Sequence, residues 1–188
     1  MKELSLNILD IAQNSVKAGA DKIEIILNEM PEKLTISIVD NGCGMSEEFL
    51  RNVQDPFCTT RTTRKVGMGI PLFKLAAEQT QGELTIVSKT IEDSPEDHGT
   101  TISALFFKNH IDFTVLGDIV STVVTLIQGS PDIRWIFSHT IDENEVCLDT
   151  EELKAVLGDV PLDNFEVICW IKSYLEEQYN EIGYDQIS

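Results

Sequence analysis

Ile36-Ser37-Ile38-Val39-Asp40-Asn41-Gly42-Cys43-Gly44-Met45 is the stretch on which the predicted fold rests. Its first residues alternate and are mostly β-branched, a pattern typical of a half-buried strand. The strand ends in Asp-Asn-Gly-Cys-Gly, where two glycines let the backbone turn and let a flat ligand lie close to it. Asp40 is an acceptor suited to an exocyclic amine such as that of adenine. A plain turn between two elements is the alternative interpretation.

A helix is predicted upstream of this strand, over residues 3–18. Apolar side chains recur along it at three- and four-residue spacing, and Gly19 suits its C-terminal end. On the same helix, Asp10, Asn14 and Lys17 project from one side. These three residues form either the solvent-exposed face of the helix or a row that faces a ligand.

Alternating apolar residues also predict the neighbouring strands. The predicted strands of the first half are 22–27, 34–39, 83–89 and 100–107. Ser46 is expected to cap a short helix that follows Asp40, because its hydroxyl can accept from the free N–H groups of a first turn. An acidic loop at 92–97 separates the last two of these strands.

Residues 52–66 are rich in Thr and Arg and show no periodicity, so they are expected to form a loop. The loop is either a plain connection or a lid over phosphates. It leads into Gly67-Met68-Gly69-Ile70-Pro71 and a helix predicted over 71–81, with Pro71 at the first helical position. A glycine-rich entry to a helix exposes backbone N–H groups that suit phosphate.

Beyond His110 the pattern of elements restarts. A helical apolar stripe is followed by a hairpin, a short helix and a last helix that begins at Asp163. The corresponding ranges are 116–127, 133–140 with 146–148, 150–157 and 163–175. We therefore expect two parts, residues 1–110 and residues 111–188, the second being a small α/β unit with no constellation that indicates chemistry.

Charge is unevenly distributed along the 188 residues, whose net charge is −18. Residues 1–110 carry 11 Lys and Arg against 16 Asp and Glu, whereas residues 111–188 carry 3 against 16. Binding to nucleic-acid phosphates needs cations, so no nucleic-acid partner is expected. The acidic second part is either a solvated surface or a docking site for a basic protein partner.

Neither a membrane segment nor a secretion signal is recognisable, so no membrane partner and a cytoplasmic location are expected. The four cysteines are widely spaced and the three histidines form no cluster with them, which argues against a metal site of the Cys/His type.

Taken together, four motifs in order resemble the ATP-binding domain of the gyrase, Hsp90, histidine kinase and mismatch-repair superfamily. Asp10-x-x-x-Asn14 is similar to the N-box; the three glycine boxes correspond to Asp40-x-Gly42-x-Gly44, Gly67-x-Gly69 and Gly99-Thr100. The resemblance covers residues 1 to about 108. It implies an α+β fold of the Bergerat type, a two-layer sandwich with helices on one face of a mixed sheet, to which the small C-terminal α/β unit is added.

Two branches of the superfamily compete. Asn14-Ser15-Val16 with the Asp-Asn-Gly-Cys-Gly motif resembles mismatch-repair ATPases. Lys17, the stretch at 55–60 and the closing Gly-Thr-Thr strand resemble the catalytic domain of two-component histidine kinases. We favour the kinase branch, because the lid and the second glycine box are closer to it.

The resemblance assigns expected roles around ATP and Mg²⁺. Asp40 would accept from the adenine amine, with Thr100 or Thr101 in support, and Asn14 would place its oxygen on Mg²⁺. Asp10 is the candidate catalytic residue. The other expected nucleotide contacts are the base-packing Gly42, Gly44 and Met45; the phosphate-facing Lys17, Arg61, Arg64 and Lys65; and the lid and hinge residues Thr59, Thr60, Gly67, Met68, Gly69 and Ile70.

Two departures from the family pattern affect the expected activity. Hydrolytic members have Glu where Asp10 stands, and because the side chain of Asp is shorter, fast hydrolysis is not expected. Pro71 replaces a glycine common in kinases. No phosphoacceptor helix pair precedes the N-box, so we do not expect autophosphorylation of the usual kind.

Three functions follow. The first is a stand-alone ATP-binding module that phosphorylates or regulates a partner protein, as anti-sigma-factor serine kinases do. The second is an ATP-driven switch with slow hydrolysis and no transfer. The third is a structural relic that binds no nucleotide.

Overall fold

The computed structural model describes residues 3–53 and 68–184. Its elements follow the chain as α1 (Leu4–Lys17), β1 (Lys22–Glu29), β2 (Lys33–Asp40), α2 (Glu47–Val53), α3 (Gly69–Gln79), β3 (Glu83–Lys89), β4 (Gly99–Phe107), α4 (Ile119–Gly129), β5 (Arg134–Ile141), β6 (Asn144–Asp149), α5 (Thr150–Leu157) and α6 (Phe165–Glu181). The predicted helices and strands are all present, with ends that differ by a few residues.

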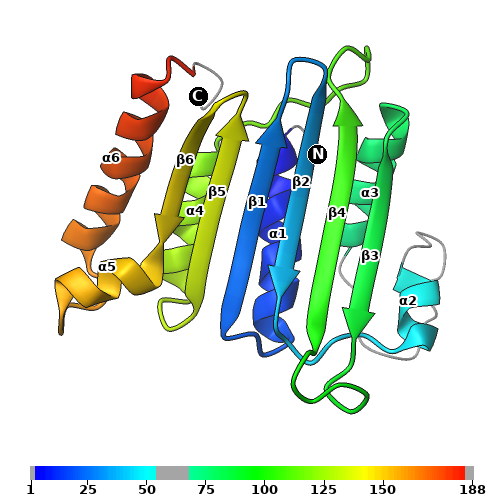
Figure 1. Cartoon of the computed structure of the whole chain (residues 1–188), viewed down its shortest axis with the longest axis horizontal. Coiled ribbons are helices and arrows are strands. Elements are labelled where there is room, and N and C mark those ends of the chain that lie inside the picture. The colour runs from blue at the N-terminus through cyan, green and yellow to red at the C-terminus, as the bar shows by residue number, and fades with distance from the viewer. Residues whose placement is uncertain (1–2, 54–67, 185–188) are drawn as a thin grey trace.

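The six strands form one mixed sheet in the order β3-β4-β2-β1-β5-β6. Only β1 and β5 run parallel, and the other neighbours are antiparallel. In Figure 1, α1, α3 and α4 lie behind this sheet. The arrangement confirms the expected α+β class of the Bergerat type.

Alternation along the central strands explains how the two layers hold together. Each strand turns every second residue toward the helices, since successive side chains of a strand point to opposite faces. The residues buried in this way on β1 and β2 are Ile23, Ile25, Leu27, Leu34, Ile36 and Ile38. They meet the apolar face of α1, where Leu4, Ile8, Ile11, Ala12 and Ser15 are buried as predicted.

The C-terminal part extends the sheet of the N-terminal part. Strand β5 pairs with β1 over eight residues, from Lys22 opposite Arg134 to Glu29 opposite Ile141. The connection before α4 also caps α1: the N–H groups of Leu4 and Ser5 donate to the carbonyls of residues 115 and 116. The described residues on both sides of residue 110 thus share one sheet and one hydrophobic cluster. The division into domains 1–110 and 111–188 stays a prediction.

Candidate functional site

Asp40, the last residue of β2, has a carboxylate held in a fixed orientation. Its Oδ2 accepts a 2.5 Å hydrogen bond from the hydroxyl of Ser15 on α1, and its Oδ1 accepts one of 2.9 Å from the N–H of Gly42. The residue is only half-buried. A carboxylate offers about four lone-pair sites, so Asp40 keeps acceptor capacity for a ligand after these two bonds.

Strand β4 places Thr100 directly opposite Asp40 in the ladder. Opposed residues share a face of the sheet, whereas Thr101 is directed to the other face. The Thr100 hydroxyl lies 2.8 Å from the hydroxyl of Ser88 on β3, which in turn accepts from the N–H of Met45 and donates to the carbonyl of Gly99. Of the two threonines considered, Thr100 is therefore the one on the side of Asp40.

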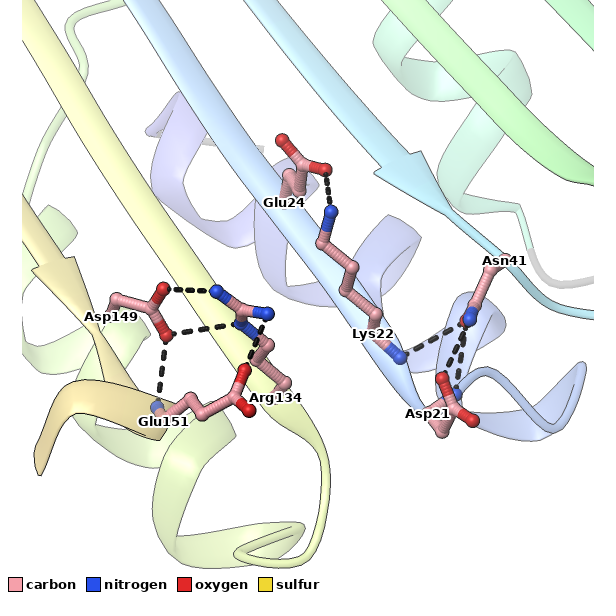
Figure 2. Close-up of polar contacts among 7 residues, drawn as sticks. All are labelled: Asp21, Lys22, Glu24, Asn41, Arg134, Asp149 and Glu151. Carbon is pink, nitrogen blue, oxygen red and sulfur yellow. Dashed lines mark hydrogen bonds and ion pairs between the residues drawn. The ribbon is translucent and has the colours of Figure 1, made fainter. Parts of the chain in front are cut away.

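Asn41 fixes the backbone that follows Asp40. Figure 2 shows its side chain reaching the start of β1, where its Oδ1 accepts from the N–H groups of Asp21 and Lys22 and its Nδ2 donates to the carboxylate of Asp21. Arg134 on β5 forms an ion-pair cluster at the same end of the sheet. We conclude that Asn41 holds the backbone of the motif in place, whereas Asp40 is the residue expected to accept from a ligand.

Gly44 follows in a conformation that other residues rarely adopt, with φ +71°. A Cβ built there would lie 1.9 Å from the carbonyl oxygen of Lys89. The adjacent Cys43 is tied on both sides, since its N–H donates to the carbonyl of Ala18 and its own carbonyl accepts from the N–H of Ile91. The first glycine motif is thereby packed between α1 and the loop after β3.

The start of α3 lies against α1 at the two residues expected to face phosphate and metal. A Cβ at Gly69 would lie 3.1 Å from Cβ of Asp10 and 3.9 Å from Nδ2 of Asn14. The carboxylate of Asp10 is exposed and Asn14 is half-buried. Helix α1 therefore contacts both glycine motifs, through Ser15 at the strand end and through Asp10 at the start of α3.

The remaining predicted site residues fall in different surroundings. Lys17 is exposed and lines a groove of about 240 Å³ between α1 and α4. Met68 precedes α3 and is 65% exposed, whereas Ile70 is buried in the core. Thr59, Thr60, Arg61, Arg64, Lys65 and Gly67, and with them the proposed lid, lie outside the described residues.

One local prediction is wrong. Helix α3 begins at Gly69, so Pro71 is the third helical residue and not the first. It is accommodated because the N–H groups of a first helical turn have no partner within the helix, so the missing N–H of proline leaves no bond unmade.

Sequence reasoning missed three residues that support this site. Ser15 was interpreted as part of an apolar helix face and of a motif shared with mismatch-repair ATPases, and Ser88 as a strand residue, but neither was assigned a role in the site. His98 lies with Nδ1 2.7 Å from the carbonyl of Gly42; because a carbonyl only accepts, Nδ1 carries the proton and donates. Small hydroxyl residues leave no signal of their contacts in hydrophobic periodicity, so only the packing of α1 and the strand register reveal the roles of Ser15 and Ser88.

The donor set fits a nucleotide with its magnesium ion better than a metal held by protein alone. Within residues 3–53 and 68–184, no group of three or more His, Cys, Asp and Glu side chains is placed to hold a metal ion. Mg²⁺ is commonly held by one or two protein oxygens together with phosphate oxygens. Asn14, half-buried beside Asp10 and the start of α3, can supply such an oxygen.

This sheet and site define an ATP-binding domain with the Bergerat arrangement. Residues 2–110 match the family model of "Histidine kinase-, DNA gyrase B-, and HSP90-like ATPase". The chain belongs to this family.

The curated relatives described here are much longer than this chain. The nitrogen regulation protein NtrY of Azorhizobium caulinodans is 29% identical over 102 residues, which are 51% of this chain and 12% of NtrY. The histidine kinase AtoS of Escherichia coli is 33% identical over 89 residues, 47% of this chain and 14% of AtoS. The chain thus spans only a small fraction of the curated relatives that it matches.

A solved structure extends the likeness past the family match. The ATPase domain of Aquifex aeolicus MutL complexed with ADP is similar with a TM-score of 0.53 at 11% identity, over 84% of this chain and 69% of that chain. That share exceeds residues 2–110, so the similarity in fold includes part of the C-terminal extension of the sheet.

Proposed function

We propose that the chain binds ATP with Mg²⁺ between Asp40 and Asn14 and uses it to phosphorylate or otherwise regulate a partner protein, in the manner of anti-sigma-factor serine kinases. The observation that carries the proposal is the double contact of α1. Ser15 orients the carboxylate of Asp40, while Asp10 and Asn14 lie against Gly69 at the start of α3.

Different residues of the site have different roles in phosphoryl transfer. Asp40 accepts from the base and so sets the register of the nucleotide. Asn14 and the start of α3 face the phosphates, where backbone N–H groups favour negative charge. When bound, Mg²⁺ neutralises phosphate charge, and transfer then depends mainly on positioning and electrostatics.

Asp10 is the residue that we propose as the proton acceptor for the attacking hydroxyl. Its carboxylate is exposed on α1, one helical turn before Asn14. A general base must come within about 3 Å of the proton that it removes. The short side chain of Asp favours an acceptor delivered into the site by a partner over a water molecule held close to the helix.

A second function is favoured by the likeness to the MutL domain. In this alternative, ATP drives a conformational switch with slow hydrolysis and without transfer, and residues 111–184 transmit the change because they continue the same sheet. Asp10 would then accept the proton of a water molecule in slow hydrolysis of ATP.

ATP labelled at the γ-phosphate separates the two functions. The purified chain is incubated with labelled ATP, Mg²⁺ and a lysate of the source cells, beside an Asp10→Asn variant. Label on a lysate protein that requires Asp10 supports transfer. Free labelled phosphate without labelled protein supports the switch. If neither labelled protein nor free phosphate forms and the ATP stays intact, both functions are contradicted.

A further inference from the structure

The outer side of α6 carries a stripe of aromatic and acidic side chains. With 100° of rotation per residue, its members fall within about 80° of helix surface. The stripe consists of Glu166, Trp170, Tyr174, Glu177 and Glu181. The opposite side of the helix packs into the core through Val167, Ile168, Ile171, Leu175 and Tyr179.

At the centre of the stripe two aromatic rings are stacked. The ring centroids of Trp170 and Tyr174 lie 5.0 Å apart with an interplanar angle of 11°. Trp170 is 50% exposed. Single exposed apolar residues are common on protein surfaces, but a stacked pair presents a broad, rigid aromatic platform. The face of such a platform attracts the cation of Lys or Arg.

The three glutamates of the stripe are exposed. Among the described residues, no salt bridge involves Glu166, Glu177 or Glu181, although Lys172 and Glu176 pair elsewhere on the same helix. The surrounding segment makes the electrostatic potential more negative, since residues 111–188 carry 16 acidic against 3 basic residues. This surface repels anionic lipid and nucleic-acid phosphate and attracts basic protein segments.

We propose that the aromatic-acidic stripe of α6 is the docking surface for a basic segment of a partner protein. Cationic side chains of that segment lie on the Trp170–Tyr174 platform, and the flanking glutamates pair with further cations. Tryptophan is among the residues that most often dominate binding energy at interfaces. The inference rests on the proposed function, because it identifies the kind of partner that the ATP-binding domain would regulate.

The docking surface can be probed with a synthetic peptide of four Arg-Ala-Ala-Lys repeats, beside a peptide with Glu in place of Arg and Lys. Binding is measured by calorimetry and by tryptophan emission. Trp135 is buried, at 2% exposure, so it supplies a constant background while Trp170 reports on the stripe. We expect saturable binding of the basic peptide with a change in emission that disappears in Trp170→Phe.

Matched variants distinguish the stripe from general charge. The triple substitution Glu166→Lys, Glu177→Lys and Glu181→Lys should weaken binding about tenfold or more. The control Glu32→Lys, Glu83→Lys and Glu143→Lys changes net charge equally at exposed residues outside α6 and should weaken binding about twofold at most.

An aromatic comparison completes the test. Trp170→Ala should weaken binding more than Phe165→Ala, since Phe165 is 78% exposed on the same helix but lies outside the stripe. Equal loss in the two triple variants, or binding with no change in Trp170 emission, overturns the inference. ATP affinity is measured in the same samples: wild-type protein that binds ATP but fails the peptide comparison contradicts the docking surface alone, whereas wild-type protein that does not bind ATP contradicts the proposed function.

Discussion

The hydroxyl of Ser15 donates a 2.5 Å hydrogen bond to Oδ2 of Asp40, twenty-five residues further along the chain. The bond connects the buried face of α1 to the end of β2. It determines which lone pairs of the carboxylate remain available to a ligand.

Ser15→Ala should therefore weaken ATP binding more than it weakens folding. A hydrogen bond to a charged group contributes about 1.5–3 kcal/mol, but Asp40 is half-buried and water can replace part of the bond in the unliganded protein. We expect a loss of unfolding free energy of about 1 kcal/mol and a loss of ATP affinity of about tenfold. Urea denaturation and calorimetry measure the two. In the control Ser103→Ala, which removes the 2.8 Å contact of the Ser37 and Ser103 hydroxyls away from the site, ATP affinity should be unchanged.

Gly69→Ala tests the contact between α3 and α1. The added Cβ lies 3.1 Å from Cβ of Asp10, which is tighter than ordinary contact, so α3 must shift relative to the residues that face phosphate. We expect weaker binding of ATP with little loss of stability, because alanine also favours a helix over glycine, although by less at this first helical residue than the value of about 1 kcal/mol in a helix interior.

Gly129→Ala is the matched control, since a Cβ at this helical residue meets nothing within 4 Å. It should raise stability slightly and leave ATP affinity as it is. Equal affinities in Gly69→Ala and wild-type protein would show that the approach of α3 to Asp10 is unimportant for the nucleotide.

At the end of β1 far from Asp40 lies a buried carboxylate, that of Glu29, which should make the free energy of unfolding depend on pH. Its Oε2 accepts from Nε2 of His139 at 3.2 Å and from the hydroxyl of Tyr184 at 2.7 Å, and Lys108 pairs with its other oxygen. Burial raises the pKa of Glu29, but the hydrogen bonds from His139, Lys108 and Tyr184 outweigh it and lower the pKa to about 2. A fourth side chain, Tyr179, holds the imidazole from the other side.

Because the folded pKa of Glu29 lies below the unfolded value, its contribution is complete above about pH 4.5 and disappears as the pH falls toward about 2. It amounts to on the order of 3 kcal/mol. In Glu29→Gln this dependence should be absent, and the variant should be less stable at pH 7. Denaturation midpoints from pH 7 to pH 3 measure it; the same acid sensitivity in Glu29→Gln and in the exposed control Glu145→Gln would contradict the account.

Gln178 on α6 protects an edge of the sheet. Its side-chain amide donates to the carbonyl of Cys147 on β6 and accepts from the N–H of the same residue, both at 3.1 Å. An edge strand with free backbone groups is a template for pairing with another chain. Gln178→Ala should speed hydrogen exchange at the Cys147 amide and increase concentration-dependent association; unchanged exchange there would show that the amide bond does not protect the edge.

Much of this architecture could be predicted from the sequence, because it depends on local periodicity. The alternation of residues 36–39 and the apolar spacing of α1 reflect burial directly, and both agree with the structure. The pairing of β5 with β1 could not be predicted in this way, since nothing local in Arg134–Ile141 indicates which strand lies beside it. The pairing is seen only in the structure, where α4 also packs against α1.

In the candidate site, too, some residues could be predicted from local sequence and others could not. Asp40 stands out because its motif is local, whereas Ser15 and Ser88 become visible as site residues only when the helix and the strand register place them. The choice between Thr100 and Thr101 likewise required the ladder, since it depends on which face of β4 each side chain occupies.

The most direct test of the central claim is calorimetric ATP binding to Asp40→Asn in the presence of Mg²⁺. The asparagine can still accept from Gly42, so the fold is expected to persist, but it loses the carboxylate charge and turns an amide N–H₂ toward the ligand. With Asp132→Asn as an exposed control, the account predicts that Asp40→Asn weakens binding about 100-fold or more while the control binds as wild type does. Equal affinity of Asp40→Asn and wild-type protein would contradict it.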